Sequence, residues 1–203
     1  IFNKVKNFPD FIHIDLIDET YNSENISIDI EMLNKIRELW PQKKLQIHLM
    51  SKNPNFWISQ LPKSRNTEVF FHYDENINIE KISSLILSKN FIPGVVLHNQ
   101  MSESQIPKLM NSFSNFMVLC VSKAGFSGQV FQNKYSDLIN KLIKISEKVN
   151  DVKITLDGGI TPKIASKFNV QEVVSASSIL NDEDSKKQII NFQTSQKYQD
   201  SEQ

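Results

Sequence analysis

Two histidines and two aspartates in this sequence could together hold a metal ion and move protons. His13 and Asp15 are separated by one residue within the apolar run 11–16, so in a strand their side chains point to the same face. His48 lies at the end of a second apolar run, and Asp157 follows a later one. Imidazole nitrogens and carboxylate oxygens are ligands that suit Zn²⁺, Fe²⁺ or Mn²⁺. A lone histidine on an apolar strand is more often a packed core residue, but four such groups at equivalent strand ends favour a metal site.

Short apolar runs alternate with segments of helical periodicity along the chain. The runs predicted to form strands are residues 11–16, 45–49, 68–72, 94–97, 116–121, 152–156 and 172–174. The segments predicted to form helices are residues 28–40, 55–61, 79–87, 102–110, 135–149, 162–168 and 184–192. Such alternation indicates a parallel sheet, either doubly wound or closed into a barrel. Helical residues 2–5 precede the first strand and suggest that one more strand–helix unit begins upstream, which would complete an eight-stranded barrel.

Glycines are concentrated in two loops that follow predicted strands. Gly125 and Gly128 lie in one loop, Gly158 and Gly159 in the other, and together they account for four of the five glycines. Glycine lets the backbone approach a ligand closely, and successive backbone N–H groups can bind an anion. The loops after the last strands of such barrels often hold a phosphate group. Ordinary tight turns would also explain the glycines, but their place beside the predicted ligands favours a phosphorylated substrate.

Composition indicates one globular domain with no large charged surface. The chain has 203 residues, with 23 Lys and Arg against 23 Asp and Glu, so we expect neither a nucleic-acid nor a membrane partner. Cys120 is the single cysteine, which excludes an internal disulfide and favours a reducing, cytoplasmic location. We predict one domain over residues 1–192 and a polar, disordered tail over 193–203. The absence of an initiator methionine suggests a piece of a longer chain.

Six segments resemble motifs of the ribulose-phosphate 3-epimerase family. They follow the family's order and spacing from about Phe11 to Leu180. Each motif is weakly specific alone, whereas the ordered set is specific. With the family pattern in parentheses, the segments are Ile12-His13-Ile14-Asp15-Leu16-Ile17-Asp18 (H-x-D-V-M-D-G), Ile47-His48-Leu49-Met50 (H-L-M), Phe71-His72-Tyr73-Asp74 (F-H-x-E), Gly125-Phe126-Ser127-Gly128-Gln129-Val130-Phe131 (G-F-G-G-Q-x-F), Leu156-Asp157-Gly158-Gly159-Ile160 (V-D-G-G-I) and Val174-Ser175-Ala176-Ser177-Ser178-Ile179 (V-x-G-S-A-I).

The resemblance implies a (β/α)8 TIM barrel of the ribulose-phosphate-binding type, with its N-terminal βα unit incomplete here. It also implies an isomerase of carbohydrate metabolism, usually oligomeric, that epimerises D-ribulose 5-phosphate, a pentose phosphate, to D-xylulose 5-phosphate at C3. One divalent metal ion would be bound by His13, Asp15, His48 and Asp157. Asp15 and Asp157 would be the catalytic acid and base on opposite faces of the substrate, acting through an enediolate that the metal stabilises. The residues implied to bind substrate and phosphate are Met50, Gly125, Phe126, Ser127, Gly128, Gly158, Gly159, Ala176 and Ser177.

The sequence departs from the family pattern mainly around the substrate. Residues 19–24 read Glu-Thr-Tyr-Asn-Ser-Glu where the family has G-H-F-V-P-N, and Ser127 and Ala176 replace glycines. A hexulose phosphate or a surface-polysaccharide precursor is therefore an alternative substrate. A decarboxylase or aldol-type synthase on a related barrel is disfavoured, because Ile17 stands where the D-x-K-x-x-D signature of that group has lysine. A non-catalytic barrel domain of a larger protein is a further alternative.

The remaining histidines and the cysteine receive separate interpretations. His72 is predicted to support the site or the fold rather than to bind metal. His98 could contact substrate or lie in a solvated loop, and the sequence leaves both open. Cys120 is predicted to be a small packing residue, because no nearby group in the sequence argues for a reactive thiolate.

Overall fold

The computed structural model of the chain describes residues 1–98, 101, 104–149 and 151–197. Within them, strands and helices alternate as the sequence predicts. The strands are β1 (Phe11–Ile17), β2 (Lys44–Met50), β3 (Thr67–His72), β4 (Ile92–Leu97), β5 (Asn115–Leu119), β6 (Lys153–Asp157) and β7 (Glu172–Val174). The helices are α1 (Phe2–Val5), α2 (Ile30–Leu39), α3 (Pro54–Gln60), α4 (Ile79–Ser88), α5 (Gln105–Met110), α6 (Ser136–Ser146), α7 (Pro162–Ala165), α8 (Ser177–Leu180) and α9 (Ser185–Lys197), with a 3₁₀ turn, η1, at Asn133–Tyr135.

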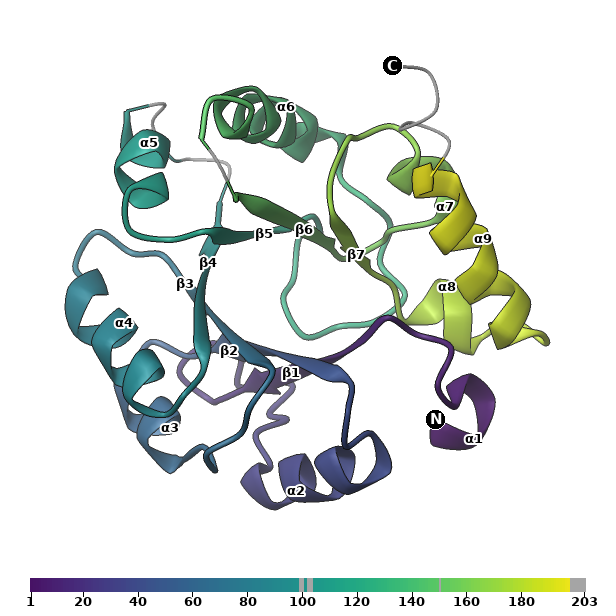
Figure 1. Ribbon diagram of the computed structural model, residues 1–203, viewed down its shortest axis with the longest axis horizontal. Helices are drawn as coiled ribbons and strands as arrows, with labels where there is room; N and C mark the ends of the chain where they lie inside the picture. The colour runs from purple at the N-terminus through teal and green to yellow at the C-terminus, as the bar shows by residue number, and fades with distance from the viewer. Residues whose placement is uncertain (99–100, 102–103, 150, 198–203) are drawn as a thin grey trace. The chain divides into compact units, whose positions relative to one another are not determined.

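The chain divides into two compact units. The first unit is Asp10–Val96, and the second is Ile1–Pro9 together with Leu97–Gln203. In the first unit β1, β2, β3 and β4 pair in chain order, all parallel. Helices α2, α3 and α4 lie along the same side of these strands (Figure 1). Parallel neighbours require such crossover helices, because the chain must return to the start of the sheet before each new strand.

Strand β2 shows why these runs form a parallel sheet. Its residues from Leu45 to Met50 are all buried, so both faces of the strand are covered. Alternate side chains then face opposite sides, with Leu45, Ile47 and Leu49 on one and Gln46 and His48 on the other. The strand ends at Met50, one residue beyond the predicted run 45–49.

Side-chain caps decide where two helices of this unit begin. The Asp29 carboxylate accepts a hydrogen bond from the Met32 N–H at 3.0 Å, so α2 starts at Ile30 rather than at residue 28 as predicted. The Asn78 side chain accepts from the Lys81 N–H at 2.9 Å, and α4 begins at the predicted residue. Both caps satisfy backbone donors that have no partner inside the helix.

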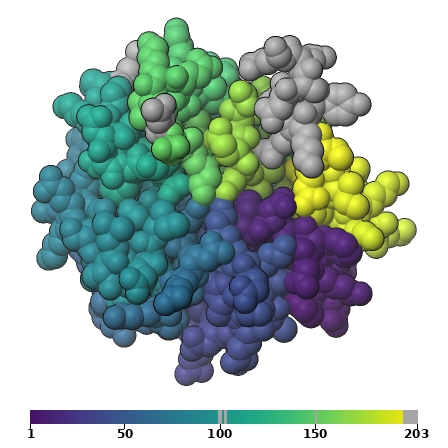
Figure 2. Space-filling view, in the orientation of Figure 1, coloured from purple at the N-terminus to yellow at the C-terminus, as the bar shows by residue number. Residues whose placement is uncertain are grey.

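The second unit carries β5, β6 and β7, which also pair in parallel and in chain order. Its N-terminal residues lie against the last helix (Figures 1 and 2). Lys4 Nζ donates to the Leu180 carbonyl at 2.8 Å, and Gln193 Nε2 donates to the Phe8 carbonyl at 3.1 Å. Thus α1 is tied to the C-terminal part of its own unit.

Several predicted boundaries in this unit are wrong. Helix α9 continues to Lys197, five residues past its predicted end at residue 192, so the first part of the predicted disordered tail is helical. The rest of that tail, residues 198–203, lies outside the described residues, as do residues 102 and 103 of a predicted helix. The short helix α8 was not predicted; its four residues lie between the predicted strand 172–174 and the predicted helix 184–192. The prediction of a single domain stays a prediction.

Among the described residues, no helix combines the length and the apolar character that crossing a membrane requires.

Candidate metal centre

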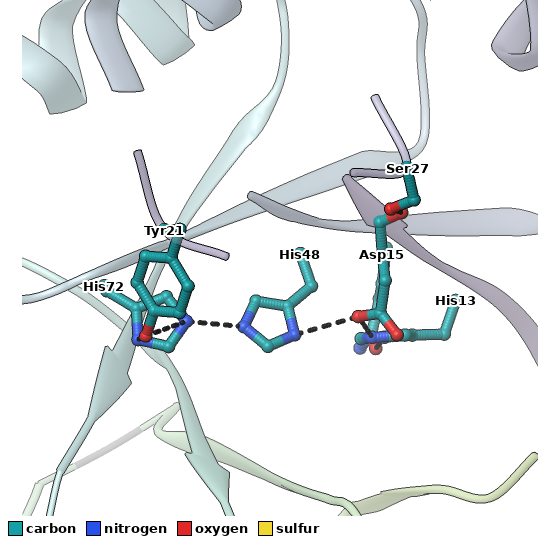
Figure 3. Close-up of polar contacts among 7 residues, drawn as sticks. His13, Asp15, Tyr21, Ser27, His48 and His72 are labelled. Carbon is teal, nitrogen blue, oxygen red and sulfur yellow. Dashed lines mark hydrogen bonds and ion pairs between the residues drawn. The ribbon is translucent and has the colours of Figure 1, made fainter. Parts of the chain in front are cut away.

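The register between β1 and β2 brings three of the predicted ligands together. Asp15 is paired with His48, and His13 lies two residues earlier on the same face of β1. The Asp15 Oδ1 atom is 3.3 Å from His13 Nε2 and 3.1 Å from His48 Nδ1 (Figure 3). One possible ligand atom from each residue lies within 4.8 Å of the others. The three side chains therefore form one ligand cluster in the first unit.

The chemistry of this cluster fits a divalent cation. Two imidazole nitrogens face the same carboxylate oxygen, and a nitrogen in that position must carry either a hydrogen or a bound cation, because two lone pairs repel. The His48 side chain is fully buried, while the Asp15 side chain is 44% exposed. The cluster is thus rigid on the imidazole side and open on the carboxylate side, as a catalytic metal site requires.

Asp15 is held in its charged form. Burial disfavours the charge and would raise its pKa, but hydrogen bonds and charge interactions with His13 and His48 outweigh that effect and hold the pKa well below its usual value. An ionised carboxylate is the form that binds a metal ion.

Each imidazole is held from behind by a second set of side chains. His13 Nδ1 is 3.1 Å from Gln46 Oε1, and the Gln46 amide donates to Glu68 Oε2 at 2.9 Å. His48 Nε2 is 2.9 Å from His72 Nε2, and the Tyr21 hydroxyl is 2.8 Å from His72 Nδ1 (Figure 3). His72 therefore contacts a predicted ligand, and its support of the site stays a prediction.

Three residues behind the imidazoles, Tyr21, Gln46 and Glu68, were not predicted from the sequence. Gln46 and Glu68 are paired in the register of β2 and β3 and are 0% and 1% exposed. Gln46 and Glu68 could have been noticed, because each is a polar residue within an apolar run. Tyr21 had no such signal, because it lies in the loop that departs most from the family pattern.

Asp18 anchors that loop. Its carboxylate, 3% exposed, accepts hydrogen bonds from Ser51 Oγ at 2.5 Å, Trp57 Nε1 at 2.7 Å and the Thr20 N–H at 3.0 Å. Burial opposes ionisation, but hydrogen bonds from Ser51, Thr20 and Trp57 prevail and lower the pKa of Asp18. The same carboxylate accepts from the Tyr21 N–H at 3.2 Å, so this network carries Tyr21 toward His72.

The fourth predicted ligand, Asp157, belongs to the second unit. It is the last residue of β6, one residue beyond the predicted run 152–156, and is 8% exposed. Its Cα partners are Leu119 in β5 and Val174 in β7. Two residues earlier, Thr155 Oγ1 donates to Glu172 Oε2 at 3.0 Å, and Lys153 Nζ lies 3.4 Å from the other oxygen of Glu172.

The glycine loops of the second unit pack against each other. Gly159 has a φ of +69°, and a Cβ on it would lie 2.2 Å from the Phe131 nitrogen. Only glycine allows this approach between the loop after β6 and the loop after β5. The segment after β7 joins them, because Ser175 Oγ donates to the Ile160 carbonyl at 2.8 Å.

Gln129 holds the loop that contains Gly125, Phe126, Ser127 and Gly128. It was not predicted as a site residue. Gln129 Oε1 accepts from the Lys123 N–H at 3.1 Å, and its Nε2 donates to the Phe126 carbonyl at 2.8 Å. Gly125 and Gly128 have positive φ values of 82° and 78°. The Gln129 side chain therefore links the two ends of the loop through hydrogen bonds to its backbone.

The other predicted residues are spread over both units. Met50 ends β2 in the first unit and is buried, whereas Gly158 follows β6 in the second. Ala176 and Ser177 lie at the start of α8. Burial and the charge of Asp157 raise the pKa of the Cys120 thiol far above its ordinary value, in keeping with a packing residue. His98 is exposed, and its role stays open.

Parallel strands that alternate with helices, with ligand-type side chains near their carboxyl ends, define the class of (β/α) barrel enzymes. Solved structures support this fold. The chain is similar to 3-hexulose-6-phosphate synthase from Salmonella typhimurium, with a TM-score of 0.65 at 12% identity, covering 97% of this chain and 90% of that one. It is also similar to a tryptophan synthase alpha-subunit from Pyrococcus furiosus, with a TM-score of 0.63 at 8% identity, covering 95% and 90%. The predicted TIM-barrel fold is confirmed.

The chain belongs to the ribulose-phosphate 3-epimerase family. The family described as "Ribulose-phosphate 3 epimerase family" matches residues 2–180. Ribulose-phosphate 3-epimerase of Helicobacter pylori strain J99 is 27% identical over 187 residues, which cover 87% of this chain and 82% of that protein. The enzyme of the same name from Buchnera aphidicola is 24% identical over 152 residues, covering 74% and 66%. The chain is therefore an isomerase that acts on carbohydrates, and its class of activity is sugar-phosphate epimerisation.

Proposed function

We propose that this protein epimerises D-ribulose 5-phosphate to D-xylulose 5-phosphate at C3 with one bound divalent cation, Zn²⁺, Fe²⁺ or Mn²⁺. The ligands are His13, Asp15, His48 and Asp157. The observation that carries the proposal is the ligand cluster, in which two imidazole nitrogens face one oxygen of Asp15 at 3.1 and 3.3 Å. The names of the relatives from Helicobacter pylori and Buchnera aphidicola support the substrate.

The proposed chemistry assigns one carboxylate to each face of the sugar. Asp15, ionised and exposed on one side, can take or give a proton at C3. Asp157, the second carboxylate, serves the opposite face, so one residue removes the proton and the other delivers one. A divalent cation would stabilise the negative charge that develops on the substrate oxygen beside the reacting carbon. The imidazoles of His13 and His48 would keep the Asp15 carboxylate in place while it exchanges a proton with the substrate.

The phosphate group is proposed to lie at the glycine loops of the second unit. Three features support this: the positive φ of Gly125 and Gly128, the close approach of Gly159 to Phe131, and the exposure of Ala176 just before α8. Backbone N–H groups in such loops can bind a phosphate without a charged side chain. Gly158, Phe126, Ser127, Ala176 and Ser177 complete the proposed binding surface, and Met50 is proposed to contact the sugar. Homo-oligomerisation and a cytoplasmic location stay predictions.

Proton NMR of ribulose 5-phosphate in D2O tests this function. With the metal-loaded protein we expect loss of the C3 proton signal and appearance of xylulose 5-phosphate. Asp157→Asn should slow the exchange by about 10²-fold or more, because a positioned acid–base group contributes about that much. Asp137→Asn on the surface of α6 is the matched control and should exchange at the wild-type rate.

Two outcomes would contradict the proposal. If a hexulose phosphate loses its C3 proton and ribulose 5-phosphate does not, the substrate is wrong and the altered loop at residues 19–24 selects another sugar. If exchange is equally fast after chelation and dialysis, the cation has no part in it.

A further inference from the structure

The segments proposed to hold the phosphate group contain a single charged side chain, that of Lys123. Asp157, which directly precedes the second segment, is assigned to the cation. A phosphate group carries about −1.5 to −2 charge at pH 7, so the place of the one lysine among these segments matters for its recognition. The segments without any other Lys, Arg, Asp or Glu are residues 120–133, 158–162 and 174–181.

The backbone of Lys123 is held by the side chain of Gln129. Gln129 Oε1 accepts a hydrogen bond from the Lys123 N–H at 3.1 Å. Gln129 Nε2 donates to the Lys123 carbonyl at 2.5 Å and to the Phe126 carbonyl at 2.8 Å. Only this orientation of the amide satisfies all three bonds, because its oxygen accepts and its NH₂ group donates. The point at which the Lys123 side chain leaves the backbone is therefore fixed relative to the loop.

The Lys123 side chain lies over the loop that it begins. Its Nζ atom is 5.4 Å from the centroid of the Phe126 ring, within the distance at which an ammonium group is attracted to an aromatic face. Phe126 is itself 36% exposed, so this contact lies at the surface. The ammonium group is thus held beside the middle of the loop and remains within reach of a ligand that binds there.

The same loop offers two backbone donors in succession. In the described part of the chain, the N–H groups of Ser127 and Gly128 make no hydrogen bond. Gly128 has a φ of +78°, and a Cβ on it would have no atom within 4 Å, so the loop borders open space at this residue. Successive N–H groups beside a cation suit an anion with several acceptor oxygens, such as a phosphate group.

We propose that Lys123 is a specificity-determining residue that pairs with the phosphate group of the sugar, and that Gln129 is the positioning residue that holds it over the loop. The inference rests on the proposed function, which places the phosphate at these loops. The Lys123 ammonium contacts one phosphate oxygen, and the N–H groups of Ser127 and Gly128 bind others. A phosphorylated sugar is then distinguished from the same sugar without phosphate by charge as well as by shape.

Steady-state kinetics with ribulose 5-phosphate tests the role of the charge. Lys123→Met keeps the length of the side chain, and we expect it to raise KM about 10-fold, which corresponds to about 1.4 kcal/mol. The kcat should stay nearly unchanged, because the phosphate is remote from the carbon that reacts. Lys123→Arg should restore most of the affinity. Lys134→Met is the matched control, since Lys134 Nζ lies 5.2 Å from the Tyr135 ring in the same kind of contact, and its KM should equal that of the wild type.

Salt dependence separates a charge effect from a packing effect. Because salt screens exposed charges, the KM of the wild type should rise more steeply between about 0.05 and 0.5 M salt than that of Lys123→Met. A lysine that only packed on Phe126 would give two parallel dependences. Gln129→Met removes three hydrogen bonds and no charge, so it should raise KM, leave kcat nearly unchanged and keep the steep salt dependence of the wild type.

Inorganic phosphate is a probe that does not depend on the sugar. In a titration followed by phosphorus-31 NMR, Lys123→Met should bind phosphate about 10-fold more weakly than the wild type. If the wild type binds no phosphate, or Lys123→Met binds it equally well, the inference is wrong whatever the substrate. Equal KM values in an active protein would overturn the inference and leave the proposed function intact. If phosphate binding depends on Lys123 but ribulose 5-phosphate is not epimerised, the inference holds and the proposed substrate is wrong.

Discussion

Asp15 is the residue on which the site converges, since both imidazoles face one of its oxygens and its side chain remains open to solvent. Its place in the site could be predicted from the sequence, because His13 and Asp15 share a strand face and His48 lies near the carboxyl end of another predicted parallel strand. The side chains that contact the far nitrogens of the imidazoles, Gln46 and His72, could not be assigned from the sequence. Which polar residue of a neighbouring strand meets which nitrogen depends on register, and a single sequence does not fix register.

Asp18 supplies a prediction on stability. Asp18→Asn should lower the free energy of unfolding at pH 7 by about 1.5–3 kcal/mol, the magnitude of one hydrogen bond to a charged group. The reason is that the new NH₂ group would face donors, either Trp57 Nε1 and Ser51 Oγ or the N–H groups of residues 20 and 21. Urea denaturation measures the difference. Asp29→Asn, a conservative change of the residue that caps α2, should lower the free energy of unfolding by only a few tenths as much as Asp18→Asn does.

The effect of Asp18 should depend on pH. Its folded-state pKa is lowered, so its charge stabilises the native state above the unfolded-state pKa of about 3.9 and ceases to do so as the pH falls through the folded-state value. The difference between wild type and Asp18→Asn should therefore be largest near neutral pH and shrink below about pH 4. A difference that grows on acidification would contradict this account.

At the scale of elements, β3 and β4 meet through one close contact. Phe70 and Gly94 are register partners, and a Cβ on Gly94 would lie 2.4 Å from Phe70 Cε1. Gly94→Ala should thus cost about 1–3 kcal/mol of unfolding free energy, as overpacking in a filled core does. In a Phe70→Leu background the same change should cost clearly less. Equal costs in both backgrounds would show that the ring is not the cause.

Element types were more predictable than element ends. Strands and long helices follow from apolar periodicity, which is why every predicted strand is present. Ends depend on local contacts, such as the Asp29 cap that delays α2. Likewise, α9 extends through polar residues partly because Gln193 is bonded to the Phe8 carbonyl, 185 residues away in sequence. Contacts of that range leave no local pattern.

At the scale of the molecule, a bound cation should stabilise the native chain, because its proposed ligands are brought together only by folding. With Zn²⁺ at 100 times its dissociation constant, binding only to the native state adds about 2.7 kcal/mol. For a chain of this size that raises the melting temperature by roughly 5–10 °C. Differential scanning calorimetry with and without chelator measures the shift. Asp157→Asn should reduce it and Asp137→Asn should not, and an undiminished shift in Asp157→Asn would remove Asp157 from the ligands.

The unequal exposure of the ligand cluster has a consequence for how a cation would come and go. His48 is sealed from solvent, while 44% of the Asp15 side chain is in contact with it. A cation would therefore reach and leave the cluster on the side of the Asp15 carboxylate, while the buried imidazole of His48 keeps its orientation. Such a site could exchange its ion without unfolding, so the identity of the ion it carries would follow the supply in the surrounding medium.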